Sequence, residues 1–384
     1  MKSAAPNLCP GRENLFGSRH PAVGGPAADP SATAPLVVTF GAIGDLVLMT
    51  GFLKVLAEAW GAPVDMVCGR APAALVYRGL DFVGEIHPMT SRRAPWWIHG
   101  SCRRVRRWLR VRPSGPVWST ELRAIRQVER FLVVTALQPR DHCVTAEDVP
   151  RGDLEHAGAW LTRLAHRSPT GLGPPPGALP AELPPPRLHL TPQEREDCRR
   201  WLAGQGWTGQ PVVVLQSQSR SRERGRWPEG RWRATAAEVH RRVPGAWLMF
   251  VGSPREGPAV RRLVHDMEIP GVRAACSDLP LRRLFALLEL AHSCISLDTG
   301  PAHVAAVLGC PTVVLAGRAD PRRNHPVGLP GRLQVVTAYG SGPWPASRAE
   351  WESAHHVRDI PASRVVAAWD SLDLSPRGTA VTGR

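Results

Sequence analysis

The sequence is almost without lysine and has no long apolar run. Only Lys2 and Lys54 are lysines, so 46 of the 48 basic residues are arginine, and the formal net charge is +15. No stretch approaches the ~18 apolar residues that a membrane span requires. The first 34 residues also lack the apolar core of a secretion signal. We therefore expect a cytoplasmic protein, whose only membrane contact would be peripheral, on the inner face of the plasma membrane.

Cysteines at metal-binding spacing are absent as well. None of the eight cysteines forms a Cys-x-x-Cys pair, and several fall in apolar runs, which favours buried, reduced thiols. Zinc-finger spacing, a basic zipper and an RNA-binding aromatic motif are missing, so no nucleic-acid partner is predicted. The arginine excess reflects either the base composition of the coding DNA or an acidic partner, such as nucleotide phosphates, phosphorylated lipid or an anionic membrane.

The 384 residues suit two domains of about 150 residues each plus tails. In the first half, residues 36–40 and 64–68 read as strands around a helix at 46–60, which is a βαβ unit and implies a parallel sheet. The second half alternates in the same way, with strands at 211–215, 247–251, 294–297 and 311–315, and helices at 192–202, 229–242, 255–266, 281–290 and 300–308. Two doubly wound α/β domains facing a cleft are therefore predicted.

Composition also predicts the boundaries of these domains. Residues 168–190 are rich in proline and glycine, which predicts an extended, poorly packed linker. The predicted divisions are a disordered tail at 1–34, an N-terminal domain at 35–167, the linker, a C-terminal domain at 191–345, a helical segment at 346–374 and a disordered tail at 375–384.

Residues 91–112 interleave tryptophans with arginines. A basic segment with tryptophans is typical of peripheral contact with an anionic membrane interface. The alternative is a surface helix whose arginine stems cover an edge of the core. Both interpretations stay open at this point.

The segment Asp298-Thr299-Gly300-Pro301-Ala302-His303 follows a predicted strand. Pro301 suits the first turn of a helix, and Asp298 or Thr299 can cap it. The free backbone N–H groups of such a turn, together with the helix dipole, form an anion site. A capped turn without any ligand would explain Asp298 and Gly300 but does not require His303.

A second turn, Gly41-Ala42-Ile43-Gly44-Asp45, follows the first predicted strand. Gly41 and Gly44 permit a sharp turn and the close approach of another group. Asp45 is then either a simple N-cap or a general base that faces the cleft and removes a proton from a hydroxyl nucleophile. The spacing is not that of the dinucleotide fingerprint G-x-G-x-x-G, which argues against a dehydrogenase.

A third segment, residues 216–232, joins a predicted strand to a predicted helix. Its hydroxyl groups and arginines, among them Ser217, Ser219, Arg224 and Arg226, are placed to neutralise a diphosphate. The alternative is a solvated basic loop.

Five motifs in this order resemble those of glycosyltransferase family nine, the ADP-heptose:lipopolysaccharide heptosyltransferases. They are Phe40 to Asp45, Trp227-Pro228 with Trp232, Phe250-Val251-Gly252, Asp298 to His303, and Gly317-Arg318-Ala319-Asp320-Pro321. The resemblance covers residues ~36–372 and is clearest over 211–328. It implies the GT-B fold, in which two Rossmann-like, doubly wound α/β domains face a central cleft.

The resemblance also implies an inverting transfer from a nucleotide-sugar co-substrate, ADP-heptose above all, without metal or cofactor. The N-terminal domain at 35–167 would bind the acceptor, a lipopolysaccharide-core or other cell-envelope glycan or glycolipid, and the C-terminal domain at 191–345 would bind the nucleotide-sugar. Asp45 would be the base, with Gly41 and Gly44 on the acceptor side. Thr299, Gly300 and Pro301 would hold the donor diphosphate, and Asp298 and His303 would organise that loop or touch the donor. The last helix, at 365–369, would return to the N-terminal domain.

One position departs from the family pattern. The family usually has a lysine just before the Trp-Pro pair, whereas this chain has Arg224-Gly225-Arg226. An arginine binds phosphate bidentately but with different geometry. The missing lysine supports an alternative hypothesis, a catalytically inactive nucleotide-sugar-binding or scaffold protein of the same fold.

Overall fold

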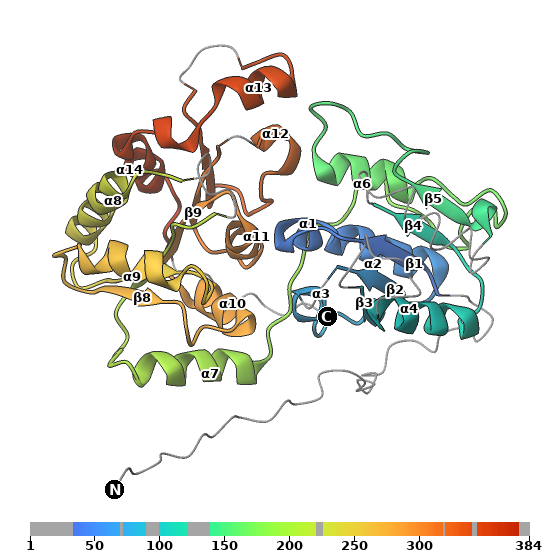
Figure 1. The fold of residues 1–384 in the computed structure, drawn as a ribbon, viewed down its shortest axis with the longest axis horizontal. Helices are drawn as coiled ribbons and strands as arrows, with labels where there is room; N and C mark the ends of the chain where they lie inside the picture. Colours follow the sequence, from blue (N-terminus) through green and yellow to red (C-terminus); the bar gives the residue numbers. More distant parts are fainter. Residues whose placement is uncertain are drawn as a thin grey trace, which may run out of the picture.

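The computed structural model describes residues 34–69, 72–89, 100–120, 139–219, 226–317, 319–339 and 344–375. They form two α/β lobes that lie side by side (Figure 1). The two predicted disordered tails lie almost wholly outside these residues, and so do residues 91–99 and Arg224.

The first lobe is built on a parallel sheet with the order β3-β2-β1-β4-β5. Its strands are β1 (Leu36–Thr39), β2 (Val64–Cys68), β3 (Val83–Pro88), β4 (Val117–Ser119) and β5 (Cys143–Thr145). Its helices are α1 (Ile43–Leu48), α2 (Thr50–Trp60), α3 (Pro72–Val76), α4 (Gly100–Val111) and α6 (Ala157–Ala165). The central strand β1 pairs with β2 and β4 and is buried throughout.

Both faces of this sheet are covered, as the predicted parallel arrangement requires. Val37 belongs to the core beneath α1 and α2, whereas Leu36 and Val38 point to the opposite face and join Val105 and Leu109 of α4. The single helix predicted at 46–60 is wrong, because the chain forms two helices that meet at Met49. There the Thr50 hydroxyl donates to the carbonyl of Val47 (2.8 Å), a local bond that competes with regular helical pairing.

The second lobe has a six-stranded parallel sheet with the order β11-β10-β9-β6-β7-β8. Its strands are β6 (Val212–Gln216), β7 (Trp247–Val251), β8 (Val272–Ala275), β9 (Ser293–Leu297), β10 (Thr312–Leu315) and β11 (Leu333–Val336). Its helices are α7 (Pro192–Ala203), α8 (Glu229–Arg242), α9 (Gly257–His265), α10 (Leu281–Leu290), α11 (Gly300–Val307), α12 (Pro321–Asn324), α13 (Arg348–Ala354) and α14 (Ala362–Asp370). The predicted pair of doubly wound domains is confirmed.

In each sheet the strand order reverses at one point, between β1 and β4 in the first and between β6 and β9 in the second. Ligands of doubly wound sheets bind beyond the carboxyl ends of the strands at this reversal. The loops after β1 and β9 contain the two glycine-containing turns singled out in the sequence, so the topology directs both of them to such positions.

The proline-rich segment 168–190 contains no helix or strand. We predicted that it would be poorly packed, but part of it lies against helix α2 of the first lobe. The Gly177 N–H donates to the carbonyl of Ala59 (2.8 Å), and the Arg187 N–H donates to the Thr50 hydroxyl (2.8 Å). Helix α2 approaches so closely that a Cβ on Gly51 would lie 2.3 Å from the carbonyl oxygen of Pro184. Glycines on both sides of this contact let the segment lie against the first lobe.

The prediction that the segment 346–374 returns to the first lobe is wrong for its last helix, whereas Arg348 at its start does bond to Asp153 of the first lobe (2.9 Å). Helix α14 packs against α8, β10 and β11 of the second lobe. Its Trp369 indole N–H donates to the Ser293 hydroxyl (2.9 Å), and Asp370 pairs with Arg242 (2.7 Å). Val365 and Trp369 are buried in the core of the second sheet, so their apolar surface is already covered there.

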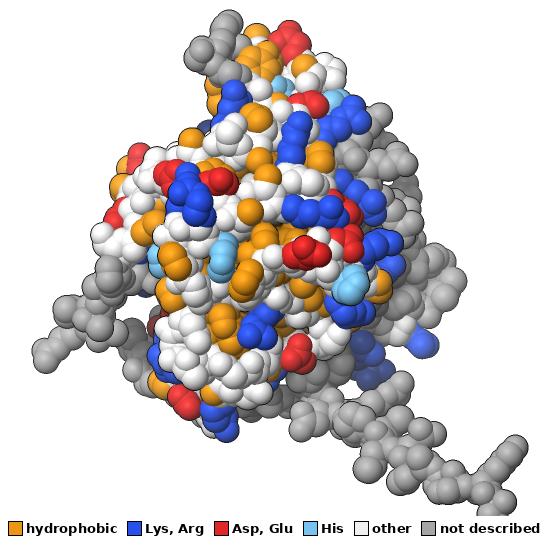
Figure 2. Space-filling model, turned by 90° about the vertical axis from the view of Figure 1, so that its left-hand side faces the viewer, with side chains coloured by type: hydrophobic (Ala, Val, Ile, Leu, Met, Phe, Trp, Pro, Cys, Tyr) orange, Lys and Arg blue, Asp and Glu red, His pale blue; other side chains and the backbone are white. Residues whose placement is uncertain are grey.

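Figure 2 faces the outer side of the second lobe and shows basic and acidic side chains interspersed over it. The positive charge of the chain is therefore not gathered into one patch on this face. Within the part of the chain that the structure describes, no helix is long and apolar enough to cross a membrane.

Candidate functional site

The two glycine-containing turns meet at the junction of the lobes, where α1 lies against α11 (Figure 1). A Cβ on Gly44 would lie 2.7 Å from Cδ2 of His303, and a Cβ on Gly300 would lie 2.7 Å from Cβ of Ile43. Such distances are shorter than real contacts allow, so only glycine permits this approach. The structure thus brings together two segments that are some 250 residues apart in the sequence.

Asp45 lies in the first turn of α1, and the N-cap position is occupied by Ala42 instead. Oδ2 of Asp45 accepts a hydrogen bond from the Ala42 N–H (2.8 Å). Although Asp45 keeps solvent access, protein atoms crowd its carboxylate, and the loss of hydration raises its pKa. The Ala42 bond and the charge of Arg151 oppose this rise. Asp45 thus supports the helix start and also presents a carboxylate to the junction.

Asp298 and His303 face each other at the start of α11. His303 Nε2 lies 3.8 Å from Asp298 Oδ1, and their side chains are only 6% and 17% exposed. Burial and the nearby charge of Asp45 raise the pKa of Asp298 to about 6. Burial and the positive fields of His156 and His325 lower the pKa of His303 to about 3. His303 is therefore neutral near pH 7, and its buried Nδ1 has no hydrogen-bond partner among the described residues.

Thr299 occupies the N-cap position of α11. We predicted that Asp298 or Thr299 would cap this helix, but no side chain makes the capping hydrogen bond. The Thr299 hydroxyl donates instead to Oε1 of Gln216 (3.0 Å), the last residue of β6. This bond joins the two strands between which the order of the second sheet reverses. Pro301 has no N–H, and the Ala302 N–H donates to the Thr299 carbonyl (3.0 Å), so the engaged Thr299 hydroxyl leaves the Gly300 N–H at the start of α11 to another acceptor, such as an anion.

The remaining predicted donor residues follow β6. Ser217 is buried directly after Gln216, and its hydroxyl accepts a bond from the Gln218 amide (3.2 Å). Ser219 is half-buried, Arg226 is exposed just before α8, and Arg224 lies outside the described residues. Ser217 therefore lies beside the Thr299–Gln216 bond, and the role of all four residues in donor binding stays a prediction.

Two of the sequence motifs build the core rather than the site. Trp227 and Trp232 are both buried, with ring centroids 4.8 Å apart in an edge-to-face contact. The Trp227 indole N–H donates to the carbonyl of Ile360 (2.8 Å), which ties α8 to the chain before α14. In the Gly317–Pro321 turn, Asp320 is buried, caps α12 and pairs with Arg322 (2.6 Å).

The sequence analysis missed a set of residues that bridges the lobes beside Asp45. Arg151 of the first lobe donates to Oδ1 of Asn324 (2.9 Å) in the second. His156 lies 3.1 Å from the carbonyl oxygen of His325, and their rings are 4.4 Å apart. Burial, together with the charge of Arg323, lowers the pKa of Arg151 to about 10. No sequence motif identifies these residues, because Arg151 is one of 46 arginines in the chain.

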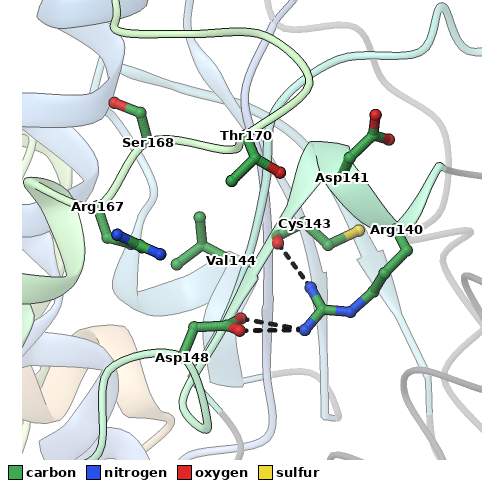
Figure 3. Close-up of a pocket in the computed structure, with 8 residues that line it drawn as sticks. All are labelled: Arg140, Asp141, Cys143, Val144, Asp148, Arg167, Ser168 and Thr170. Atoms are coloured by element: carbon green, nitrogen blue, oxygen red, sulfur yellow. Dashed lines mark hydrogen bonds and ion pairs between the residues drawn. The ribbon is translucent and has the colours of Figure 1, made fainter.

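A separate depression of about 460 Å³ lies at the outer strand β5 of the first lobe (Figure 3). Arg140 pairs there with Asp148 (3.1 Å) and donates to the carbonyl of Cys143 (2.8 Å). The eight lining residues include no residue of the α1–α11 junction. This depression therefore does not contain the predicted chemistry.

Comparison with known sequences points to one family. Residues 177–338 match the model of Glycosyltransferase family 9 (heptosyltransferase). The chain is 25% identical over 189 residues to lipopolysaccharide heptosyltransferase 3 of Escherichia coli, which covers 48% of this chain and 53% of that protein. It is 34% identical over 109 residues to lipopolysaccharide heptosyltransferase 1 of Pseudomonas aeruginosa, which covers 28% and 29%. The chain thus matches about half the length of the first relative and less than a third of the second.

Solved structures share the fold over most of their length. A glycosyl transferase family 9 protein from Veillonella parvula has a TM-score of 0.69 at 18% identity, covering 88% of this chain and 96% of that one. The ADP-heptose lipopolysaccharide heptosyltransferase II of E. coli has a TM-score of 0.64 at 18% identity, covering 88% and 98%. The predicted GT-B fold is confirmed by this likeness.

The predicted independence from metal stays a prediction. Among the residues that the structure describes, no group of three or more His, Cys, Asp and Glu side chains is placed to hold a metal ion. One protein of similar fold, TibC, is a dodecameric, iron-containing heptosyltransferase that was solved with ADP-D-β-D-heptose. Its TM-score is 0.53 at 13% identity, covering 90% of this chain and 78% of that one.

Proposed function

We propose that this chain, of which residues 177–338 match the model of glycosyltransferase family 9, is a member of that family. It would be an inverting glycosyltransferase that moves heptose from ADP-heptose onto a lipopolysaccharide-core or other cell-envelope glycan. One observation carries the proposal beyond the family. A carboxylate of the first lobe, Asp45, lies at the same junction as the open N-terminus of α11 in the second lobe. A base for one substrate and an anion site for the other are thereby held together.

In this mechanism Asp45 acts as the general base. An acceptor hydroxyl attacks the anomeric carbon of the donor while its proton passes to a carboxylate oxygen of Asp45. The bond from the anomeric carbon to the diphosphate oxygen breaks, and ADP leaves with the electron pair. The crowding that raises the pKa of Asp45 makes it a stronger base than a fully hydrated aspartate.

The second lobe would stabilise the departing diphosphate. The N-terminus of α11 would offer the backbone N–H groups of Thr299 and Gly300 and the positive end of a helix dipole, while Pro301, which has no N–H, fixes the first turn. Ser217, Ser219, Arg224 and Arg226 would add hydroxyl donors and positive charge from the loop after β6. His303 is neutral and buried, so its role is to donate a hydrogen bond or hold the loop without adding charge.

Replacing Asp45 tests its role as the base. Asp45→Asn removes the proton acceptor while keeping the shape of the side chain, and we expect transfer to fall by about 10²–10⁴-fold. Donor affinity, measured by calorimetry, should change little, because Asp45 belongs to the acceptor side. Asp81→Asn, an exposed aspartate in the same lobe, is the matched control. Equal transfer by wild type and Asp45→Asn would remove Asp45 from the mechanism.

Calorimetry with ADP-heptose, ADP-glucose, UDP-sugars, GDP-sugars and free ADP tests the choice of donor. Selective binding of ADP-heptose is the expected result, in line with the relatives' names. Selective binding of another nucleotide-sugar would support the glycosyltransferase activity but exclude heptose as the donated sugar. No binding by folded protein would favour the inactive scaffold of the same fold.

The acceptor side also includes a proposed contact with an anionic membrane through α4. Ser101, Cys102, Val105 and Leu109 of this helix are buried, whereas Arg103, Arg104, Arg107 and Arg110 are exposed, and the helix has no acidic residue. Each basic residue near an anionic lipid surface contributes about 1 kcal/mol of attraction.

Co-sedimentation with phosphatidylglycerol vesicles and with phosphatidylcholine vesicles measures this contact. Charge reversal at Arg103, Arg107 and Arg110 should abolish binding to the anionic vesicles. Reversal of Arg199 and Arg200, which are exposed on α7, should not. Equal sedimentation of both variants would show that α4 is only a surface helix.

A further inference from the structure

Gln216, the last residue of β6, joins two loops of the second lobe. The residue is only 4% exposed, so its side chain is buried at the point where the strand order of the second sheet reverses. Its amide contacts the loop after β9 on one side and the loop after β6 on the other. Both loops contain residues that we expect to bind the donor diphosphate.

The hydrogen bonds of Gln216 fix the orientation of its amide. Nε2 donates to the carbonyl of Gln218, and a carbonyl can only accept. Oε1 must therefore face the two hydroxyls on the other side, those of Thr299 (3.0 Å) and Ser296 (3.4 Å). The Thr299 hydroxyl thus meets an acceptor, to which it donates its proton.

The distances decide where the proton of each hydroxyl goes, because a hydroxyl has only one proton to donate. The Ser296 hydroxyl is closer to the carbonyl of Leu297 (2.7 Å) than to Gln216. The Thr299 hydroxyl is closer to Gln216 than to the same carbonyl, which lies 3.2 Å away. The Ser296 proton is therefore assigned to Leu297, and the Thr299 proton to Gln216.

Helix α11 competes with Gln216 for the Thr299 hydroxyl. A threonine at the N-cap position ordinarily accepts a hydrogen bond from the N–H of the second or third helical residue. In α11 the second residue is Pro301, which has no N–H, so only the N–H of Ala302 remains. A hydroxyl that accepted this bond would lie over the first turn of α11, where the Gly300 N–H is left to an anion.

We propose that Gln216 is a positioning residue for donor binding: it holds the Thr299 hydroxyl away from the first turn of α11 and so keeps that turn open to a diphosphate. The role rests on the proposed function, in which α11 binds the diphosphate of the nucleotide-sugar. Gln216 acts through Thr299 in this role, so it is not a catalytic residue.

Replacing Gln216 releases the Thr299 hydroxyl. Gln216→Met keeps the length of the side chain and removes both polar groups, so the freed hydroxyl caps α11 and occupies its first turn. Calorimetry on the full chain measures the affinity for ADP and for inorganic pyrophosphate. We expect both affinities to fall about three- to tenfold, the scale of one neutral hydrogen bond.

Urea unfolding shows whether Gln216→Met is folded. Gln216→Asn, whose amide is one methylene further from Thr299, is the second variant and should show the same loss. Wild-type affinity in either folded variant would overturn the proposal.

Ser296→Ala is the matched control. It removes a buried hydroxyl beside Gln216 whose proton goes to Leu297, so the bond between Gln216 and Thr299 stays. The affinity for pyrophosphate should stay within about twofold of wild type, because the 3.4 Å contact between Ser296 and Gln216 is long for a hydrogen bond. A loss equal to that of Gln216→Met would mean that any change in this buried network weakens binding, and it would overturn the particular role of Gln216.

A double-mutant cycle with Thr299→Val tests whether Gln216 acts through the Thr299 hydroxyl. Valine has the shape of threonine without the hydroxyl, so no group is released onto α11 when Gln216 is replaced. In the Thr299→Val background, Gln216→Met should therefore change the affinity for pyrophosphate by less than about twofold. An equal loss in both backgrounds would overturn the proposal, because Gln216 would then act by another route.

Pyrophosphate binding and sugar transfer separate this role from the proposed function. Wild type that binds pyrophosphate, weakens in Gln216→Met and transfers no sugar would uphold the effect of Gln216 on the anion site and sink the proposed function. Wild type that transfers sugar, with Gln216→Met binding ADP equally well, would do the reverse. Folded wild type that binds neither ADP nor pyrophosphate would overturn both.

Discussion

Asp298→Asn should make the protein more stable than wild type at pH 8. At pH 4.5 this gain in stability should be much smaller. Asp298 is a largely buried carboxylate that faces the negative Asp45 and a neutral His303. Its pKa of about 6 in the folded protein compares with about 3.9 for an unfolded chain. A difference of about two units corresponds to about 3 kcal/mol, because each unit is worth 1.36 kcal/mol.

The direction of the pH dependence follows from the raised pKa. Between about pH 4 and pH 6 the folded protein holds a proton that the unfolded chain has released. The free energy of unfolding therefore falls as the pH rises through this window, and the penalty is complete above pH 6. Asparagine has nearly the same shape and no charge, so the variant escapes the penalty.

Urea unfolding at pH 4.5, 6 and 8 measures the effect, with the transition of the second lobe fitted separately if the lobes unfold in two steps. At pH 8 we expect Asp298→Asn to be more stable by about 1–3 kcal/mol, an advantage that shrinks by about 2 kcal/mol at pH 4.5. Asp81→Asn, at an exposed turn, should stay within about 0.5 kcal/mol of wild type throughout. A variant less stable than wild type at pH 8, or a difference that does not vary with pH, would refute the reasoning.

A second substitution separates the two causes of the raised pKa of Asp298, which are burial and the charge of Asp45. Part of the rise in the pKa of Asp298 comes from the charge of Asp45. The gain from Asp298→Asn should therefore be smaller in an Asp45→Asn background. Equal gains in both backgrounds would mean that burial alone is responsible. A site that lowers stability in this way is expected where two carboxylates are held together for chemistry.

Two further predictions concern stability. Gly44→Ala should lower the free energy of unfolding by about 1–3 kcal/mol, because the added Cβ would lie 2.7 Å from the buried ring of His303. Gly230→Ala is the control, because a Cβ there meets nothing within 4 Å. An equal Tm for both variants would contradict the clash. Arg282→Met should cost about 1–3 kcal/mol, because it leaves the largely buried Glu194 with the more exposed Arg78 (3.3 Å) as its remaining arginine partner. A loss below about 0.5 kcal/mol in denaturant unfolding would show that the Arg282–Glu194 pair contributes little to the second lobe.

The sequence predicted the second lobe better than the first. Strands β6 and β7 of the second lobe are almost wholly apolar runs of five residues, whereas the first lobe contains the three-residue strands β4 and β5. Strands so short are formed by pairing with their neighbours and leave little periodicity to detect. The break at Met49 and the placement of α14 were missed because both depend on local or distant contacts rather than on periodicity.

By itself the sequence determined which segments follow the central strands and what chemistry they contain. Asp45 and the Asp298–His303 turn could be found because parallel strands end at one edge of their sheet, where ligands bind. The tertiary structure alone decided that Gly44 meets His303, that Thr299 bonds to Gln216 and that Arg151 reaches Asn324 from the other lobe. These contacts join residues that are 83 to more than 250 positions apart. No local pattern encodes them, because the Thr299–Gln216 bond forms only when β6 and β9 pair in the second sheet, and the other two contacts form only when the two lobes meet.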